Sequence, residues 1–239
     1  MTAAVAYLQA FALIRWNDQK KRKRQMPAEM TTPRFTADDL TAMQIHVVID
    51  GIEPPVWRRL VVPVHFTLAQ LHPILQAAFG WTDSHLHQFK IGGLRYGDAE
   101  LMDAERIGEL EPRMFDALRV RLKDFSLYGG ETLTFTYIYD FGDNWVHRVT
   151  LEKLLVARPA PKKTACIEGA RSGPPEDVGG PHGYMEFLRV LLTPGADEMA
   201  EQQDLKRWIG GKFDPEMFDL AKTEKAVRGA LRRQPRGYA

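Results

Sequence analysis

One segment in the middle of the chain constrains the fold more than any other. Residues 137–151 read YIYDFGDNWVHRVTL, in which two strand-like runs flank Asp140, Gly142 and Asp143. Alternation with period two is typical of β-strands, and Asp and Gly favour tight turns. The segment therefore predicts an antiparallel hairpin that turns at Gly142. The turn needs Gly142 and one aspartate, whereas it does not need His147.

The residues before this hairpin predict a second hairpin and a helix. Residues 43–52 and 56–62 are rich in β-branched residues and indicate two paired strands. Apolar residues at spacings of three and four predict a helix that starts after Thr67 as N-cap and ends at Gly80. This order of elements is typical of an α+β fold.

The remaining patterns complete an α+β architecture with a mixed or antiparallel sheet, a helix after the first hairpin and a C-terminal set of helices. A Gly/Pro-rich loop over residues 166–183 separates the strands from the last helices. Further strands are expected over residues 85–93 and 117–125, and helices over 184–192, 197–209 and 215–231.

Charge divides the chain into basic ends and an acidic middle. Residues 1–34 and residues 222–239 each have a net charge of +5, so residues 35–221 carry −9 within a total of +1. Duplex binding needs Lys and Arg to displace counterions, so we expect at most weak nucleic-acid contact, through the basic termini. The predicted organisation is a flexible basic extension over 1–41, one domain over 42–232 and a basic tail over 233–239.

The N-terminal residues do not predict a secretory signal or a membrane span. Residues 3–14 are apolar and the basic run KKRKR follows at 20–24, which reverses the order in a signal peptide. About 20 apolar residues are needed to cross a bilayer. The run is either a short helix or an extension upstream of Met26 or Met30. Cys166 is the only cysteine in the sequence, and a cytoplasmic location is expected.

Histidines and aspartates gather at the ends of two predicted strands. His85 and His87 are two residues apart, so they share one strand face, and His147 follows the turn that contains Asp140 and Asp143. Imidazole and carboxylate groups suit a divalent metal such as zinc. These five residues are the candidate metal ligands, and the three imidazoles are expected to converge. The alternative is that each histidine is a core residue bonded to backbone.

The loop over residues 166–183 is the second candidate site. Its PPEDVGG segment has a stiff backbone, so we expect it to be ordered and to pack near the PPVWRR strand. Glu176 and Asp177 are then expected to pair with Arg58 or Arg59, or to cap a helix. The candidate binding surface consists of Trp57, Arg58, Arg59, Glu176 and Asp177.

Five segments carry a family resemblance. They are, in order, EPPVWRRLVVP, TLAQLHPILQAAFGWTDSHLHQFKIGG, YDFGDNWVHRVTLEK, CIEGARSGPPEDVGGPHGYMEFL and GGKFDPEMFDLAK. Over residues 42–221 the chain resembles the plasmid pRiA4b ORF-3-like family. The resemblance implies an α+β domain often found on plasmids and mobile elements, and it implies no established activity.

Two features of the resemblance bear on function. Many relatives read ACPPED, whereas this chain has Gly173 in SGPPED, so a zinc site built on two loop cysteines would lack a ligand here. Some members carry a resolvase-like label, but this sequence shows neither a serine-recombinase nor a tyrosine-recombinase arrangement. Two hypotheses remain: a non-enzymatic binding or adaptor module with a protein partner, and a metal-dependent, hydrolase-like enzyme that uses the histidine and carboxylate cluster.

Overall fold

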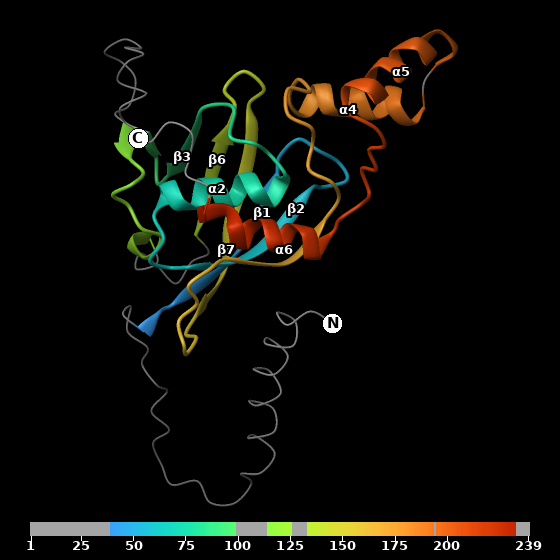
Figure 1. The fold of residues 1–239 in the computed structure, drawn as a ribbon. Coiled ribbons are helices and arrows are strands. Elements are labelled where there is room, and N and C mark those ends of the chain that lie inside the picture. Colours follow the sequence, from blue (N-terminus) through green and yellow to red (C-terminus); the bar gives the residue numbers. More distant parts are fainter. Residues whose placement is uncertain (1–38, 99–113, 126–132, 194, 233–239) are drawn as a thin grey trace, which may run out of the picture.

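A single eight-stranded sheet organises the molecule (Figure 1). The computed structural model describes residues 39–98, 114–125, 133–193 and 195–232. The strand order is β5-β4-β3-β6-β7-β1-β2-β8, and each neighbouring pair is antiparallel except β4 and β5. The strands are β1 Ala42–Ile49, β2 Trp57–Pro63, β3 His87–Ile91, β4 Leu94–Gly97, β5 Met114–Asp116, β6 Thr134–Tyr139, β7 Trp145–Leu155 and β8 Ala165–Ala170.

Both predicted hairpins are present, and they lie side by side in the sheet. β1 pairs with β2, and β6 pairs with β7 with Tyr139 opposite Trp145 across the turn. β1 also pairs with β7, so the two hairpins form the centre of the sheet. Because side chains alternate along each strand, Ile45 and Leu60 face the helices and belong to the core.

Helix α2, Leu68–Phe79, has the boundaries that the sequence predicts. The Thr67 side chain accepts a hydrogen bond from the backbone of Gln70, whose own side chain accepts one from the Thr67 backbone. This capping box satisfies amides that would otherwise lack a partner at the start of the helix. Gly80 ends the helix in the left-handed conformation that glycine adopts without strain.

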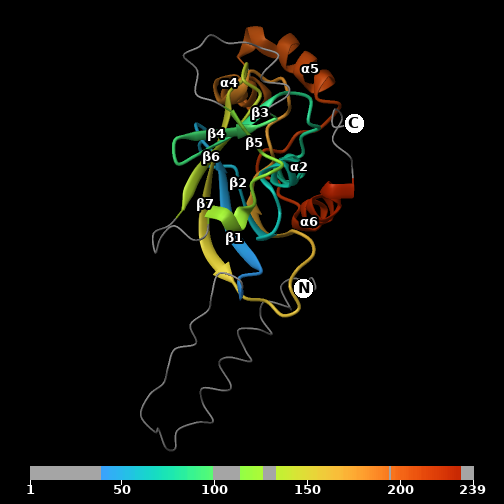
Figure 2. The same cartoon turned by 90° about the vertical axis from the view of Figure 1, so that its left-hand side faces the viewer.

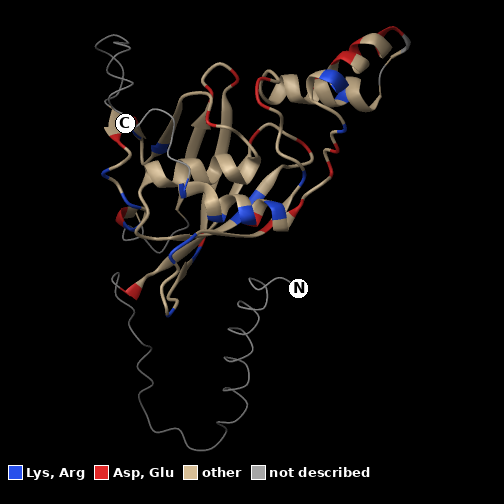
Figure 3. Cartoon of the chain, in the orientation of Figure 1, with Lys and Arg blue, Asp and Glu red and all other residues tan. Residues whose placement is uncertain are grey.

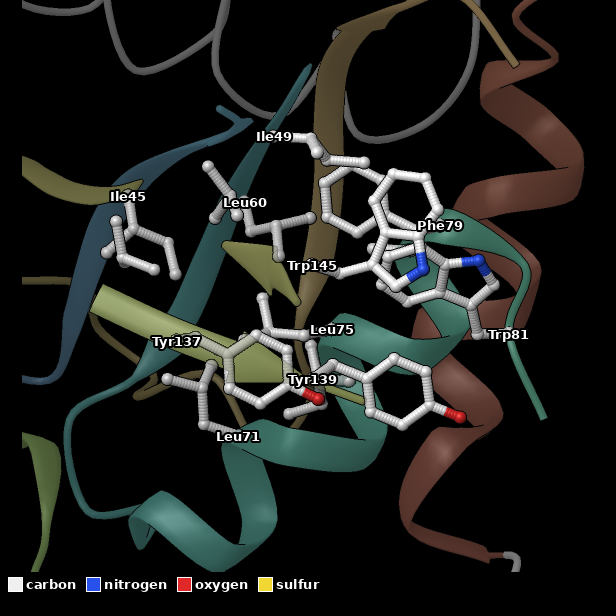
Figure 4. Close-up of a cluster of buried hydrophobic side chains, with 14 of the residues drawn as sticks. Ile45, Ile49, Leu60, Leu71, Leu75, Phe79, Trp81, Tyr137, Tyr139 and Trp145 are labelled. Atoms are coloured by element: carbon white, nitrogen blue, oxygen red, sulfur yellow. The ribbon is translucent and has the colours of Figure 1, made fainter. Parts of the chain in front are cut away.

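Helices cover one face of the sheet and extend from one end of it. α2 and α6, Leu220–Gly229, lie on the same side of the sheet (Figures 1 and 2). α4, Gly180–Leu192, and α5, Met199–Trp208, pack on each other beyond the sheet end. In Figure 4 the rings of Phe79, Trp81 and Trp145 gather in the core between α2 and the sheet.

Three predicted elements differ from the structure. The expected strand over residues 117–125 is wrong, because β5 ends at Asp116 and residues 122–125 form a 3₁₀ turn. The loop expected from residue 166 begins as strand β8, which pairs with β2 at the sheet edge. The last helix begins after Asp219, whose side chain accepts a hydrogen bond from the Lys222 amide, and not at Pro215.

The outer boundaries of the domain stay predictions. The expected flexible extension falls almost wholly outside the described residues, and the tail over 233–239 lies entirely outside them. Within the described part of the chain, no helix has both the length and the apolar character required to cross a bilayer.

Candidate functional site

Three loops meet at the end of the sheet where β6 ends and β3 and β7 begin. They are residues 80–86 between α2 and β3, residues 140–144 between β6 and β7, and residues 171–179 between β8 and α4. In Figure 3, red segments mark acidic residues in the loops at this end of the molecule. Polar side chains from segments far apart in the sequence therefore lie close together here.

The first group, which we call the rim cluster, consists of His85, Asp140 and Asp177. Nε2 of His85 lies 2.9 Å from Oδ1 of Asp177 and 3.6 Å from Oδ2 of Asp140. One ligand atom from each residue lies within 4.8 Å of the other two. The exposed fractions of the side chains are 31% for His85, 13% for Asp140 and 67% for Asp177, so the cluster is open to solvent on one side.

Backbone geometry places both carboxylates of the rim cluster. Asp140 and Asp177 have φ values of 55° and 61°, in the left-handed region that is uncommon outside glycine. Oδ1 of Asp140 accepts a hydrogen bond from the Gly142 amide, which closes the turn as an Asx turn. The turn thus uses one oxygen of Asp140 and leaves Oδ2 facing His85.

Glu176 holds the loop that carries Asp177. Its Oε2 accepts hydrogen bonds from the amide and the hydroxyl of Thr82, and its Oε1 accepts one from the Tyr139 hydroxyl at 2.6 Å. Burial and the hydrogen bond to Glu176 both raise the pKa of Tyr139, so its hydroxyl stays protonated. Trp81 adds a hydrogen bond from its indole to the Pro174 carbonyl.

Asp143 ties the same loop to the β6–β7 turn. Its Oδ2 accepts a hydrogen bond from the Gly179 amide at 3.1 Å. Gly180 then packs on the turn so closely that an added Cβ would lie 2.2 Å from the Asp143 carbonyl oxygen. Asp143 therefore acts as a structural anchor in this geometry, next to the rim cluster and outside it.

A second group lies inward from the rim cluster and centres on His72. Nδ1 of His72 lies 2.7 Å from the Tyr137 hydroxyl, and Nε2 lies 2.6 Å from Oδ1 of Asp83. Gln76 donates to the Tyr137 hydroxyl through Nε2 and accepts from the Asp83 amide through Oε1. These four residues form a closed circuit of hydrogen bonds, which we call the His72 circuit.

His87 joins this second group and is separated from the rim cluster. Its ring stacks on His72 with centroids 3.5 Å apart and planes 4° from parallel. Burial, together with the neighbouring His72, lowers the pKa of His87 well below its usual value. His85 precedes β3 and lies outside the strand, so the expectation that His85 and His87 share one strand face is wrong.

His147 lies apart from the other predicted ligands, in the core. Tyr137 is paired with His147, whereas Tyr139 is paired with His87, so β6 runs between the two histidines. Nδ1 of His147 lies 3.1 Å from the Trp145 carbonyl, and burial lowers the pKa of the imidazole to about 4. The structure does not bring the three predicted imidazoles together, and His147 fits the alternative of a core histidine.

The five residues of the predicted binding surface do not lie on one surface. Three of them lie on the two faces of β2, and the other two lie in the loop between β8 and α4. Trp57 and Arg59 are partly exposed on one face of β2, whereas the guanidinium of Arg58 is buried between the rings of Phe79 and Phe218 on the other. Arg58 donates to the carbonyls of Trp57, Ala78 and Ala170.

The predicted ion pairs of the loop are wrong. Arg59 pairs with Glu152 and Glu168, and Arg58 uses backbone carbonyls. Glu176 binds Thr82 and Tyr139, and Asp177 binds His85. The loop is ordered as predicted, and at its beginning Arg171 donates to the carbonyl of Pro54, which precedes β2.

Sequence analysis missed His72, Gln76 and Asp83. A signal was present, because His72 and Gln76 are polar residues four apart on a helical face that is otherwise apolar and buried. Such a pair predicts a buried polar network, since buried polar groups need hydrogen-bond partners. Asp83 lies in a short loop and gave no comparable signal.

Gly173 has a packing reason in this chain. An added Cβ would lie 1.9 Å from the Phe79 carbonyl oxygen, so no side chain fits on this backbone. Glycine at this position therefore allows the loop to approach the C-terminal end of α2 closely.

Comparisons with known proteins agree with this architecture. The chain is 35% identical over 190 residues to uncharacterized protein y4hQ of Sinorhizobium fredii (strain NBRC 101917 / NGR234), a match that covers 78% of this chain and 91% of that protein. The crystal structure of MM3350 from Methanosarcina mazei Go1, a protein of unknown function, superposes with a TM-score of 0.65 at 35% identity. It covers 77% of this chain and 96% of the other. The family profile matches residues 41–222, and the chain belongs to the plasmid pRiA4b ORF-3-like protein family.

Proposed function

We propose that this protein is a non-enzymatic binding module that takes a divalent transition-metal ion in the rim cluster and presents this end of the sheet to a protein partner. The observation that carries the proposal is the meeting of one imidazole nitrogen and two carboxylate oxygens within 4.8 Å. The three residues come from three separate loops, so the folded chain assembles the donor set.

The donor set has the chemistry of a transition-metal site. One imidazole and two carboxylates suit zinc, manganese or iron(II), and each ligand atom would lie about 2.0–2.2 Å from a zinc ion. Asp140 and Asp177 both carry negative charge beside His85, and a cation would offset their mutual repulsion. The hydrogen bonds to Oδ1 of Asp140 orient this carboxylate, as outer-shell contacts do in metal sites.

Apolar side chains beside the rim cluster support a protein partner. Leu86 and Phe141 each follow a rim residue in the sequence, and their exposed fractions are 36% and 39%. The Asp140 amide donates to the Leu86 carbonyl, so the two loops lie next to each other. Exposed apolar side chains around a polar centre are typical of interaction sites. A cytoplasmic location is part of the proposal.

A metal-dependent hydrolase is the second candidate function. It is favoured by the exposure of Asp177, because a rim-bound ion would keep coordination positions open for water. Incubation of the manganese-loaded protein with a chromogenic phosphodiester separates the two functions. Hydrolysis that is faster than with Mn²⁺ alone, and that is abolished in Asp177→Asn, would support the hydrolase and contradict a non-enzymatic binding module.

Metal titration tests the proposal directly. Protein purified without an affinity tag is titrated with Zn²⁺ and Mn²⁺ by calorimetry, alongside His85→Ala and Asp177→Asn. Changes to outer-shell residues of metal sites lower metal affinity by about 10- to 100-fold. We expect these two variants, which change proposed ligands, to lose at least that much affinity for the metal ion at the rim. His65→Ala and Asp204→Asn change exposed residues outside the cluster and should bind as the wild type does. Equal affinity in all five proteins would contradict the proposal.

A further inference from the structure

The outer side of α6 carries a row of positive charge. Lys222, Lys225 and Arg228 lie three residues apart in the helix, and Arg232 follows in the 3₁₀ turn Ala230–Arg232 that continues it. Side chains at spacings of three and four share one side of a helix. All four residues are exposed, and in Figure 3 blue segments recur along α6. We call these four residues the basic stripe.

Carboxylates of the described chain neutralise little of this charge. Arg228 lies 3.3 Å from one oxygen of Glu224, whose other oxygen accepts a hydrogen bond from the Cys166 amide. The other three residues of the stripe make no ion pair with the described residues. Lys222 lies in the first turn, where positive charge opposes the helix dipole, and it repels Lys225 three residues later. These two charges therefore do not serve the stability of α6.

The apolar side of α6 is already buried, which limits the kinds of partner that the exposed side can take. Val227 and Ala230 are 2% and 5% exposed, and Leu220 packs against the same core. Leu231 is the only large apolar side chain of α6 and its 3₁₀ turn that is exposed. A helix that inserts into a lipid surface needs a free apolar face, and protein interfaces need an apolar centre. The stripe instead fits a partner with a regular array of negative charge.

The length of the stripe matches the phosphate spacing of duplex DNA. At 1.5 Å per residue, the helix covers about 15 Å from Lys222 to Arg232. Each strand of the duplex has one phosphate per roughly 3.4 Å of axis, so the stripe faces about four phosphates. No residue of α6 is aromatic, so the helix offers no ring on which unpaired bases could stack. The fit is therefore to a duplex and not to a single strand.

The acidic middle of the chain does not cancel this attraction. Residues 35–221 carry a net charge of −9, whereas the stripe lies within residues 222–239, which carry +5. Salt at 0.1 M largely screens charges that are more than about 10 Å apart. A duplex that lies on α6 therefore interacts mainly with the cations beside it, and the distant carboxylates lower the affinity only at low salt.

We propose that the basic stripe binds the phosphate backbone of duplex DNA without reading the base sequence. The site is independent of metal binding at the rim cluster, and it gives a location to the weak nucleic-acid contact that the charge distribution predicts. Contacts to phosphates from Lys and Arg position a protein on the duplex but carry no sequence information. Non-specific binding of this kind has dissociation constants of about 10⁻⁴–10⁻⁶ M at physiological salt.

The salt dependence of DNA binding tests the proposal. Full-length protein without an affinity tag is titrated into a short, fluorescently labelled duplex of mixed sequence, and anisotropy is followed between about 50 and 200 mM KCl. Lys222→Gln/Lys225→Gln removes two charges from the stripe, and glutamine is a good helix former. Lys90→Gln/Lys153→Gln removes two charges from exposed residues of β3 and β7 and is the matched control. Circular dichroism confirms that both variants are folded.

The two double variants should differ in slope. Each phosphate contact contributes about 0.9 to the slope of log K against log salt concentration, so the slope should decrease in magnitude by about 1.8 in Lys222→Gln/Lys225→Gln and stay unchanged in the control. No binding by the wild type at the lowest salt, or the same slope in both double variants, would overturn the proposal. Anionic phospholipid vesicles are the second probe. Vesicle binding that only Lys222→Gln/Lys225→Gln loses, with an unchanged slope for DNA, would assign the stripe to a membrane surface and overturn the DNA site.

Discussion

Nε2 of His85 lies 2.9 Å from Oδ1 of Asp177, although the two residues are 92 positions apart in the chain. The contact depends on Glu176, which Thr82 and Tyr139 hold by hydrogen bonds beside the α2–β3 loop. Glu176 is thus a positioning residue that brings Asp177 into the rim cluster. The predictions below follow from this arrangement and from the packing around it.

Glu176→Gln should weaken metal binding at the rim by about 10-fold, the lower end of the range for outer-shell changes. Glutamine places an NH₂ group where the carboxylate now accepts hydrogen bonds, so the loop loses contacts with Thr82 and Tyr139. Calorimetric titration with Zn²⁺ at 25 °C measures the effect on protein that circular dichroism shows to be folded. Glu186→Gln, a change in an exposed residue of α4, is the control. An unchanged dissociation constant in Glu176→Gln would remove its positioning role.

The free energy of unfolding should fall as the pH is lowered from 7 to 5, and His147 should be a main cause. Burial lowers the pKa of His147 to about 4 in the folded state, against about 6.5 in the unfolded chain. The unfolded chain therefore takes up a proton that folded His147 does not. This difference destabilises the fold by about 2 kcal/mol at pH 5. The lowered pKa of His87 acts in the same direction.

Replacement of His147 should reduce that pH dependence. In His147→Phe, the difference in urea-unfolding free energy between pH 7 and pH 5 should shrink by roughly 1–2 kcal/mol. His182→Gln removes an exposed histidine and should leave the difference as it is in the wild type. The same pH dependence in His147→Phe and in the wild type would show that His147 is not buried as described.

Gly173→Ala should destabilise the protein by about 2 kcal/mol or more, because the new Cβ would overlap the Phe79 carbonyl oxygen at 1.9 Å. Gly229 lies in α6 with nothing within 4 Å of an added Cβ, so Gly229→Ala should be neutral or stabilising by up to about 1 kcal/mol. Chemical denaturation of both variants measures the difference. Equal stabilities would contradict the close approach of this loop to α2.

Arg58→Ala should cost roughly 2–4 kcal/mol, since it leaves buried carbonyls without donors and removes a cation from between two rings. Arg59→Ala, the next residue, should cost less than about 1 kcal/mol because its ion pairs with Glu152 and Glu168 are exposed. The two urea-unfolding curves give the comparison. If Arg59→Ala lowers the free energy of unfolding more than Arg58→Ala does, the result would contradict the burial of Arg58 and the exposure of Arg59.

Local patterns predicted the elements whose causes are local. The capping box at Thr67 and the glycine at 80 define α2, and Gly142 with its aspartates marks the β6–β7 turn. β8 was missed because its strand pattern is short and runs directly into a Gly/Pro-rich loop, and its pairing with β2 depends on residues about 110 positions away.

The sequence placed some of the candidate residues at the same end of the sheet. His85 and Asp140 were expected at the ends of strands of one sheet, and Nε2 of His85 lies 3.6 Å from Oδ2 of Asp140. Asp177 joins them through the long-range contacts of Glu176. His147 was placed in the wrong group because local alternation does not reveal strand order, and β6 lies between β7 and β3.

Anomalous diffraction from crystals grown with MnCl₂ tests the central proposal most directly. We expect a peak at the manganese edge about 2.0–2.3 Å from Nε2 of His85, Oδ2 of Asp140 and Oδ1 of Asp177, distances typical of such ligands. Asp177→Asn crystals grown in the same way should lack that peak. Wild-type crystals with no anomalous peak among these three residues, at manganese concentrations that label other sites, would contradict metal binding at the rim.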